Sequence, residues 1–334
     1  MNQTRTFLLI AWLFVAFLLF QQWQSPLLNP EVSTAQAPTA PTTAANPAPV
    51  AGTSLPSLPA QASAAAPSLP AIAAAGTGQT VTIESDVHKL SIDLNGVSIV
   101  RAELKGYPLE KKSGSPNVVL LDDKGADFYV AQSGWLTQSG QSAPTHEARF
   151  RTRDGETAYR MADDQDTLVV PFVWEDPSGV KLTKSLVLHR GRFDIGVRQE
   201  IENKSDAGWT GFAYEQLKRI APPPPPTHAG FTNPDAFSTV GSAWYSPQDK
   251  FETLKFADYL EDGVLQNPNK QVKDGWLGML EHHFVSVWVP EKNDTQNYSN
   301  AIENIGNQTQ YIIRGVSGES VLAPGAKLSR EDVL

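Results

Sequence analysis

The sequence predicts a mainly β protein: a large antiparallel β-sandwich preceded by one transmembrane helix and a disordered linker. Three features of the 334 residues support this prediction. An apolar run near the N-terminus is long enough to be a membrane helix, the stretch after it is dominated by Ala and Pro, and apolar and polar residues alternate from Thr80 onward. These features divide the chain into residues 1–24, 25–79 and 80–334.

The N-terminal segment is predicted to be an uncleaved signal-anchor helix. Its apolar run extends from Phe7 to Phe20 and ends near Trp23. As an α-helix, Phe7–Trp23 would be roughly 25 Å long, within the range of membrane-spanning helices. A cleaved signal peptide would carry a small-x-small site directly after the run, but the first such site is Ala35–Ala37. A buried core helix is disfavoured because the segment lacks a polar face.

Charge sets the predicted orientation of this helix. Arg5 precedes the apolar run, and no Lys or Arg follows it until Lys89. Because positively charged flanks remain in the cytoplasm, the N-terminus is predicted to be cytoplasmic and the rest of the chain to lie across the membrane. In a bacterium the protein would contact the lipid bilayer of the inner membrane through Phe7–Trp23, with its bulk in the periplasm.

Residues 25–79 are predicted to be a disordered linker. They include 16 Ala and 10 Pro but only one charged residue, Glu31. Such a segment cannot bury enough apolar surface to offset the entropy lost on ordering, and its Pro content keeps it extended. Its simplest role is a tether that lifts the following domain off the bilayer.

The remaining residues, 80–334, are predicted to form many short strands. In RFDIGVRQEIEN, residues 192–203, Phe193, Ile195, Val197 and Ile201 share one parity and charged residues share the other, as in a half-buried strand. Turn-forming residues separate similar segments at 81–86, 89–94, 98–104, 148–153, 181–190 and 310–316.

Two segments depart from this alternation. Residues 167–174, TLVVPFVW, are apolar on both parities, as expected for a strand buried on both faces. Residues 251–263, FETLKFADYLEDG, are compatible with either a short helix or a strand. Because short strands dominate the rest, a large sandwich is the predicted architecture.

The composition excludes several classes of function. The chain has 27 Lys plus Arg against 36 Asp plus Glu, a net charge of −9, and no basic tract. Binding to nucleic acid requires clustered Lys and Arg, so no nucleic-acid partner is predicted. The absence of cysteine removes disulfides, thiolate metal sites and cysteine nucleophiles.

Residues 275–290, GWLGMLEHHFVSVWVP, place Glu281, His282 and His283 inside an apolar run. These polar residues make the run a poor membrane helix. Its C-terminal half is apolar on both parities, which predicts an interior strand. Adjacent strand residues point to opposite faces, so His282 and His283 would not share an ion, and the HExxH spacing is absent. No metal site is predicted here.

Other clusters are predicted to be turns or loops. Asp163-Asp164-Gln165-Asp166 lacks the alternating ligands and the glycine of a calcium loop, and Asp122-Asp123-Lys124-Gly125 has the same interpretation. APPPPPT, residues 221–227, is predicted to be a stiff loop, with docking into a partner's aromatic groove as the alternative. No nucleophile-elbow, P-loop or dinucleotide motif occurs. We therefore predict no catalytic, cofactor-binding or metal-ligating residue, and no enzymatic activity.

The stretch at 275–290 resembles the signature strand in the large periplasmic domain of the YidC-type bacterial membrane protein insertases. Residues 1–23 are similar to the first transmembrane helix of that family. FYVAQSGW, LTKSLVLHRGRFDIGVRQEIENKS and FAYEQLKRI occur in the order that the family has them. The resemblance covers residues 1–23 and most of 80–334, whereas the linker does not match.

This resemblance implies a β-supersandwich, similar to galactose mutarotase-like folds, that hangs from one signal anchor. It also implies that the protein inserts and helps fold inner-membrane proteins, with or without the Sec translocon. The expected partners are nascent inner-membrane proteins, the Sec translocon and its accessory subunits. The family's five further transmembrane helices have no counterpart after Trp23. The sequence is therefore expected to be an N-terminal portion, truncated or split, that anchors and supplies the periplasmic interaction or chaperone domain.

A second function stays open at this point: a periplasmic carbohydrate-binding or mutarotase-like domain on a membrane anchor. Such a site would need a histidine and a carboxylate that converge in a cleft. His189, His228 and Glu215 are the candidates. This alternative rests on analogy of fold alone.

Overall fold

The computed structural model describes residues 79–137, 141–222, 239–259, 270–281 and 283–334. The predicted anchor at Phe7–Trp23, linker residues 25–78, His228 and His282 lie outside these residues. Among the residues that the structure describes, no helix is long and apolar enough to cross a membrane.

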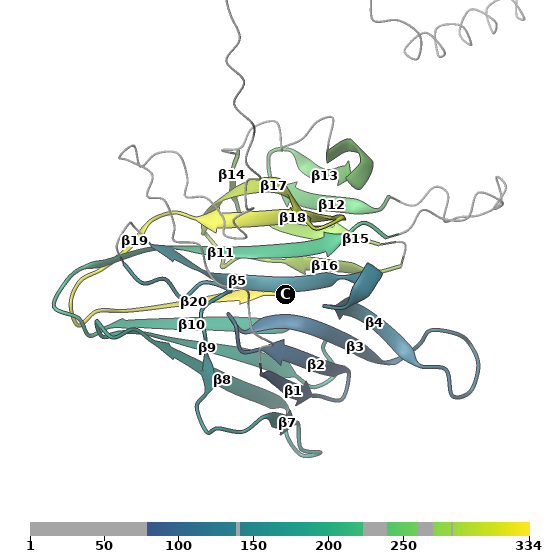
Figure 1. Cartoon of the computed structure of the whole chain (residues 1–334), viewed down its shortest axis with the longest axis horizontal. Helices are drawn as coiled ribbons and strands as arrows, with labels where there is room; N and C mark the ends of the chain where they lie inside the picture. Colours follow the sequence, from purple (N-terminus) through teal and green to yellow (C-terminus); the bar gives the residue numbers. More distant parts are fainter. Residues whose placement is uncertain (1–78, 138–140, 223–238, 260–269, 282) are drawn as a thin grey trace, which may run out of the picture. The chain divides into compact units, whose positions relative to one another are not determined.

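The largest sheet contains 11 strands (Figure 1). In spatial order they are β14 (Lys270–Lys273), β17 (Thr295–Ile305), β18 (Gln308–Ser317), β11 (Trp209–Ile220), β5 (Tyr129–Thr137), β4 (Asn117–Asp122), β3 (Ser98–Pro108), β2 (His88–Asp93), β1 (Thr80–Glu84) and β7 (Ala158–Arg160), with β19 (Ser320–Leu322) paired to β11. The pairings are antiparallel except for β1 with β7, which run parallel.

Two smaller antiparallel sheets accompany it. The five-stranded sheet has the order β20 (Lys327–Val333), β10 (Ile195–Asn203), β9 (Val180–His189), β8 (Thr167–Glu175) and β6 (Arg151–Thr152). The four-stranded sheet has the order β13 (Lys250–Lys255), β12 (Gly241–Ser246), β15 (Trp276–Leu280) and β16 (Val285–Trp288). Two 3₁₀ turns, η2 (Gly125–Asp127) and η4 (Phe256–Tyr259), connect strands.

The three sheets share one hydrophobic core, and buried tryptophans join them. Trp135 on β5 donates its indole N–H to Gln199 Oε1 on β10 at 3.1 Å, which joins the largest sheet to the five-stranded one. Trp288 on β16 donates to the carbonyl of Gln216 on β11 at 3.1 Å, which joins the four-stranded sheet to the same large sheet. Buried indole N–H groups need such partners, so these contacts fix how the layers pack. The predicted antiparallel β-sandwich is confirmed.

The alternation predicted for residues 192–203 is confirmed within β10. Ile195, Val197 and Ile201 are buried, and the intervening Arg198 and Glu200 are exposed. Phe193, which shares their parity, lies before the strand begins and keeps 42% of its surface exposed. The alternating pattern therefore predicted one buried residue too many, because the pairing of β10 with β9 begins only at Ile195.

The prediction that TLVVPFVW is buried on both faces is wrong in part. On β8, Leu168, Val170, Phe172 and Val173 are buried, but Val169 is 46% exposed. One face of this part of the five-stranded sheet is open to solvent, so an apolar residue at that parity does not enter the core.

The single interior strand predicted for GWLGMLEHHFVSVWVP is also wrong, because the stretch folds as a hairpin. β15 pairs with β16 from Leu277 opposite Trp288 to Leu280 opposite Val285, and the Glu281 N–H donates to the Phe284 carbonyl at 2.8 Å to close the turn. β16 ends the four-stranded sheet. The described histidine of the pair, His283, thus lies in a turn rather than in a strand.

Two further predictions concern local structure. Asp163 and Asp164 occupy a turn, closed by a hydrogen bond from Gln165 N–H to the Ala162 carbonyl at 3.1 Å, as predicted. In the ambiguous stretch 251–263, the structure shows both alternatives in sequence, since β13 ends at Lys255 and the 3₁₀ turn η4 follows directly. Residues 260–263 lie outside the described part.

Candidate functional site

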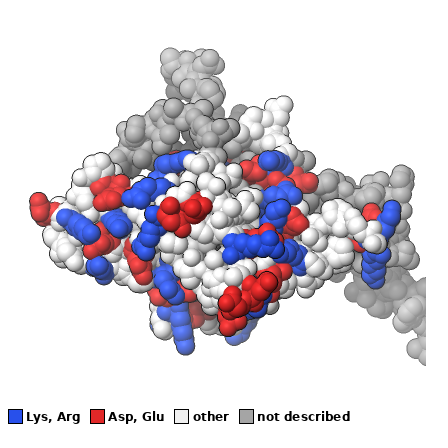
Figure 2. All heavy atoms as spheres, turned by 90° about the horizontal axis from the view of Figure 1, so that it is seen from below, with Lys and Arg blue, Asp and Glu red and all other residues white. Residues whose placement is uncertain are grey.

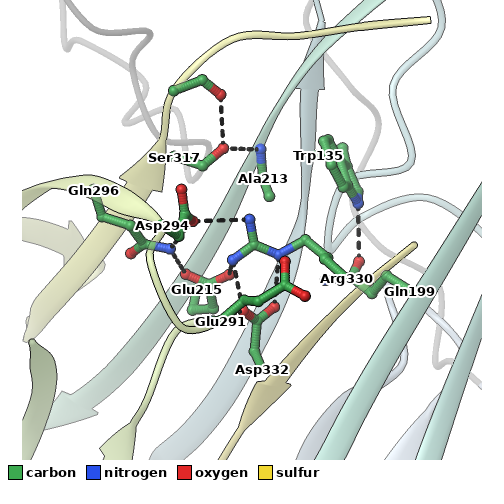
Figure 3. A network of polar contacts seen from close by, with 11 residues as sticks. Trp135, Gln199, Ala213, Glu215, Glu291, Asp294, Gln296, Ser317, Arg330 and Asp332 are labelled. Carbon is green, nitrogen blue, oxygen red and sulfur yellow. Dashed lines mark hydrogen bonds and ion pairs between the residues drawn. The ribbon is translucent and has the colours of Figure 1, made fainter. Parts of the chain in front are cut away.

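A cluster of buried charges surrounds Arg330 of β20 and Glu215 of β11 (Figure 3). Arg330 Nη2 donates to Glu215 Oε1 at 2.9 Å, and Arg330 Nε donates to Asp332 Oδ2 at 3.0 Å. Arg330 Nη1 reaches Asp294 Oδ2 at 3.1 Å. Gln296 Nε2 donates to the second oxygen of Glu215 at 2.7 Å. One guanidinium therefore joins the edge of the five-stranded sheet to the largest sheet.

The pKa values of this cluster reflect its burial. Burial raises the pKa of Glu215 well above its ordinary value, the neighbouring Asp332 raises it further, and Arg330 opposes both. Burial alone would lower the pKa of Arg330, but Glu215 and Asp332 together hold it above its ordinary value. In the folded protein Glu215 therefore binds a proton at a higher pH than an exposed glutamate does.

Lys184 on β9 is a further buried charge within electrostatic reach of this cluster. Its Nζ atom donates to the carbonyls of Gly96 at 2.7 Å and Ser133 at 2.9 Å. Burial lowers the pKa of Lys184 to about 7, and the carboxylates of Asp332 and Glu215 counteract part of that shift. Through these contacts Lys184 joins β9 to the turn before β3 and to β5, inside the sandwich.

His146 and Tyr214 form a closed buried pair. The Tyr214 hydroxyl accepts from the His146 backbone N–H at 2.8 Å and lies 2.6 Å from the ring atom Nδ1. Burial lowers the pKa of His146 to about 3, so the neutral ring is the form present in the folded protein. A neutral Nδ1 accepts the hydroxyl proton, which satisfies both groups without water.

The three residues considered for a mutarotase-like site are not brought together. Glu215 is fully buried and fully engaged by Arg330 and Gln296. His189 ends β9 in a different sheet, where its Nδ1 atom lies 2.9 Å from the Thr167 hydroxyl. His228 lies outside the described residues. The geometry therefore gives no support to an acid–base pair built from His189 and Glu215.

A hollow of about 400 Å³ opens elsewhere, beside the start of β1. Its lining includes Gln79, Arg151, Arg153 and Asp154, and neither Glu215 nor His189 takes part in it. Within the described ranges, no three His, Asp or Glu side chains are grouped so that they could hold a metal ion.

A row of aromatic rings, one exposed and two half-buried, crosses three strands of the four-stranded sheet. Tyr245 on β12 pairs directly with Phe251 on β13 and with Trp276 on β15. The Tyr245 and Trp276 rings are stacked, with centroids 6.4 Å apart and planes 13° apart, and the Phe251 ring lies 5.9 Å from Trp276. Phe251 is 54% exposed. We call these three residues the aromatic ladder.

Sequence analysis did not identify the aromatic ladder. Its members belong to three short strands, and which of these strands pair becomes known only from the fold. A detectable signal was Phe251, an aromatic residue in the mostly polar segment KFETLK.

The charged residues of the surface are mixed in sign. On the face seen in Figure 2, Lys and Arg side chains are interspersed with Asp and Glu side chains, with no continuous basic area. Binding to a nucleic-acid backbone uses a basic stripe or patch, which this face does not present. The aromatic ladder, with one exposed and two half-buried rings on a regular sheet, is the stronger candidate for molecular contact.

The sequence matches known proteins along almost its whole length. A family model described as the YidC periplasmic domain matches residues 80–332. Proteins named "Membrane protein insertase YidC" are 36% identical over 340 residues in Xanthomonas campestris pv. campestris strain 8004 and 39% identical over 346 residues in Xanthomonas oryzae pv. oryzae strain PXO99A. Both alignments cover 99% of this chain but 57% of the relative, so the chain spans little more than half the length of these relatives.

Solved structures of similar fold have low identity. A galactose mutarotase related enzyme from Lactobacillus acidophilus aligns over 76% of this chain and 96% of its own, with a TM-score of 0.46 and 11% identity. A putative aldose 1-epimerase from Escherichia coli K12 aligns over 76% and 97%, with a TM-score of 0.40 and 10% identity. The sequence matches, in contrast, are decisive: this chain belongs to the YidC family of membrane protein insertases, and residues 80–332 match that family's periplasmic domain.

Proposed function

We propose that this chain supplies the membrane anchor and the periplasmic interaction domain of an insertase that inserts and helps fold inner-membrane proteins. In this proposal residues 1–24 span the inner membrane, residues 25–79 are the tether, and residues 80–334 contact nascent membrane proteins and the Sec translocon with its accessory subunits. The domain acts by binding rather than by catalysis.

The aromatic ladder is the observation that carries the binding role. Exposed Tyr, Trp and Phe rings are the residues that most often anchor protein–protein contacts. Here the three rings lie on adjacent strands in register, so they present one continuous surface.

The position of the ladder also suits an extended partner. Its outermost strand, β13, ends the four-stranded sheet among the described residues, and most of its side chains are exposed. An extended segment can add to such an edge by backbone hydrogen bonds while its side chains pack on neighbouring rings. A newly translocated segment or an extended loop of a translocon subunit has this chemistry.

Site-specific photocrosslinking tests the proposal. A photoreactive phenylalanine analogue at Phe251, in the full-length insertase in cells, should crosslink to nascent membrane proteins or to translocon subunits. The same analogue at Val321 is a matched control, because Val321 is 69% exposed and lies on β19 of the largest sheet. Equal crosslinking from both positions would show that the ladder is not a binding surface.

The proposed orientation has a separate test. Protease added outside the cell should digest residues 80–334 once the outer membrane is opened, but not in intact cells. Protection of the domain in spheroplasts would place it in the cytoplasm and refute the anchor orientation deduced from Arg5 and Lys89.

A further inference from the structure

A second aromatic cluster lies at one end of the domain, where elements of all three sheets meet. The Tyr107 ring lies 5.6 Å from the Phe193 ring and 6.5 Å from the Phe284 ring, both edge-on. Tyr107 ends β3, Phe193 lies in the turn between β9 and β10, and Phe284 lies in the turn between β15 and β16. With Leu109, these residues form what we call the apical cluster.

The apical cluster is unusually apolar for a surface. Tyr107 is 48%, Leu109 66% and Phe193 42% exposed, and the adjacent Val285 is 48% exposed. Isolated exposed apolar residues are ordinary, but several in contact mark a site of interaction with a protein or a membrane.

The cluster rests on a rigid base. His88, buried directly beneath it, has its Nε2 atom 3.0 Å from the Phe193 carbonyl and packs edge-on against the Phe193 ring. The loop that carries Leu109 is closed by hydrogen bonds from Leu109 N–H to the Pro116 carbonyl at 2.8 Å and from Glu110 N–H to Ser115 Oγ at 2.9 Å. The Phe193 ring and the backbone that carries Leu109 are therefore held in place.

The loop that follows Tyr107 carries basic residues. Lys111 and Lys112 follow Leu109 on the same exposed loop, where Glu110 is the one acid, so residues 109–115 carry a net charge of +1 (two Lys minus one Glu). Arg192, next to Phe193, is exposed and paired with Asp194 at 2.7 Å. In Figure 1 this β3–β4 loop extends well beyond the sheets. A projecting tip of this composition differs from the flat aromatic ladder, which an extended strand would fit.

The composition fits one partner, the interface of a lipid bilayer. Tyrosine rings favour the headgroup level, aliphatic and phenylalanine side chains favour the acyl boundary, and lysines favour anionic headgroups. We infer that the apical cluster docks this domain onto the surface of an anionic bilayer, through Tyr107, Leu109 and the flanking lysines. This inference rests on the membrane attachment proposed above, which keeps the domain within reach of lipid.

The absence of cysteine allows a direct test with the full chain. Single changes Ser113→Cys, Ser178→Cys and Ser25→Cys each give one site for an environment-sensitive fluorophore. Ser113 lies on the β3–β4 loop, and Ser178 lies in the turn before β9, at the opposite end of that strand from Phe193. The ten residues of β9 put that control about 33 Å from the apical cluster. Ser25 follows the apolar N-terminal run and reports whether the anchor inserts.

The labelled proteins are reconstituted in vesicles of phosphatidylcholine with phosphatidylglycerol, with and without lipids brominated near the headgroup. The label at position 113 should be quenched and blue-shifted, and the label at position 178 should not. The double change Tyr107→Ser with Leu109→Ser should weaken docking about tenfold, because it removes apolar surface from the interface. Lys111→Gln with Lys112→Gln should weaken it roughly fivefold per lysine, only in anionic vesicles.

The outcomes separate the two proposals. Quenching at Ser25 without quenching at Ser113 overturns docking and leaves the anchor intact. Quenching at Ser113 without quenching at Ser25 supports docking and refutes the anchor. If a protein rather than lipid covers the apical cluster, position 113 stays unquenched in these vesicles, which contain no other protein. That result also overturns the inference. Unchanged circular dichroism and thermal midpoint in both double variants exclude misfolding as the cause of any loss.

Discussion

Two regions of this domain contrast with each other: one buries charged side chains between the sheets, and the other leaves aromatic rings open to solvent. Between the sheets, Arg330, Asp332 and Glu215 are almost wholly buried. On the outside of the four-stranded sheet, Tyr245 and Phe251 leave ring surface open to water. Buried charge is tolerated only when it is paired, and exposed rings contribute little to folding. The comparison teaches that the charges maintain the fold and that the rings are available for partners.

Removing the central cation should have the largest effect on stability. Arg330→Met leaves Glu215, Asp332 and Asp294 without their shared partner, so the free energy of unfolding should fall by about 3–5 kcal/mol. Urea unfolding of the detergent-solubilised chain measures it. Arg198→Met is the matched control, because Arg198 on β10 pairs with Glu331, the neighbour of Arg330 on β20, at 3.0 Å, but both side chains are well exposed. Arg198→Met should lower the free energy of unfolding by at most about 1 kcal/mol. A loss equal to that of Arg330→Met would show that burial of the ion pair makes no difference.

Acid should lower the stability of the folded protein through its two buried histidines, His88 and His146. Burial lowers the pKa of His88 to about 4 and of His146 to about 3, so both are neutral when folded and gain a proton on unfolding below pH 6.5. Their contribution is complete above pH 6.5 and is lost as pH falls toward those values, by roughly 2 kcal/mol each between pH 6.5 and 5.

A substitution at His146 tests how much of this acid sensitivity comes from that residue. His146→Asn keeps an acceptor near the Tyr214 hydroxyl but cannot titrate, so it should remove about half of the pH dependence between pH 6.5 and 5. Urea unfolding at several pH values measures the slope. An unchanged slope in this variant would show that His146 titrates normally in the folded state.

Glu215 should behave in the opposite sense. Its raised pKa means that the folded state holds a proton that the unfolded state releases above about pH 4.5, so its contribution to stability is lost as pH rises. Glu215→Gln mimics the protonated form and should change the free energy of unfolding by no more than about 1 kcal/mol at pH 5. Between pH 5 and 9 the variant should lose less stability than the parent chain, and a steeper loss would show that the pKa of Glu215 is not raised in the folded state.

Removing an exposed ring should have the smallest effect on folding. Phe251→Ser should change the free energy of unfolding by no more than about 0.5 kcal/mol, as for other surface positions, while reducing crosslinking to partners at the aromatic ladder. Phe256→Ser supplies the opposing control. Phe256 follows Phe251 closely in the chain, but it is buried and its ring packs beside the Tyr311 ring. It should cost about 3–5 kcal/mol. Similar costs for both would mean that the ladder is part of the core.

Alternation predicted most of the fold because it is a local signal. The segment at 192–203 shows its buried row directly, since each side of a strand repeats every second residue. The same signal could not show which strands pair. It therefore read residues 275–290 as one strand, although the turn at Glu281–Phe284 makes them two.

The candidate sites were harder to predict. Glu215 and Arg330 lie 115 positions apart, and no local pattern links them. The aromatic ladder and the apical cluster each gather residues from several strands or turns, so their proximity is a property of the tertiary fold. The resemblance of motifs identified the family, which residue spacing alone would not have done.

The contact between Glu215 and Arg330 also sets an order of events during folding. Because the chain is synthesised from its N-terminus, Glu215 is made long before Arg330. Until β20 arrives and pairs with β10, the carboxylate lacks its cation and the edge of the five-stranded sheet lacks a neighbour. Contacts between distant positions close slowly. The sandwich is therefore completed only when β20 is in place, so its buried charges find their partners late in folding.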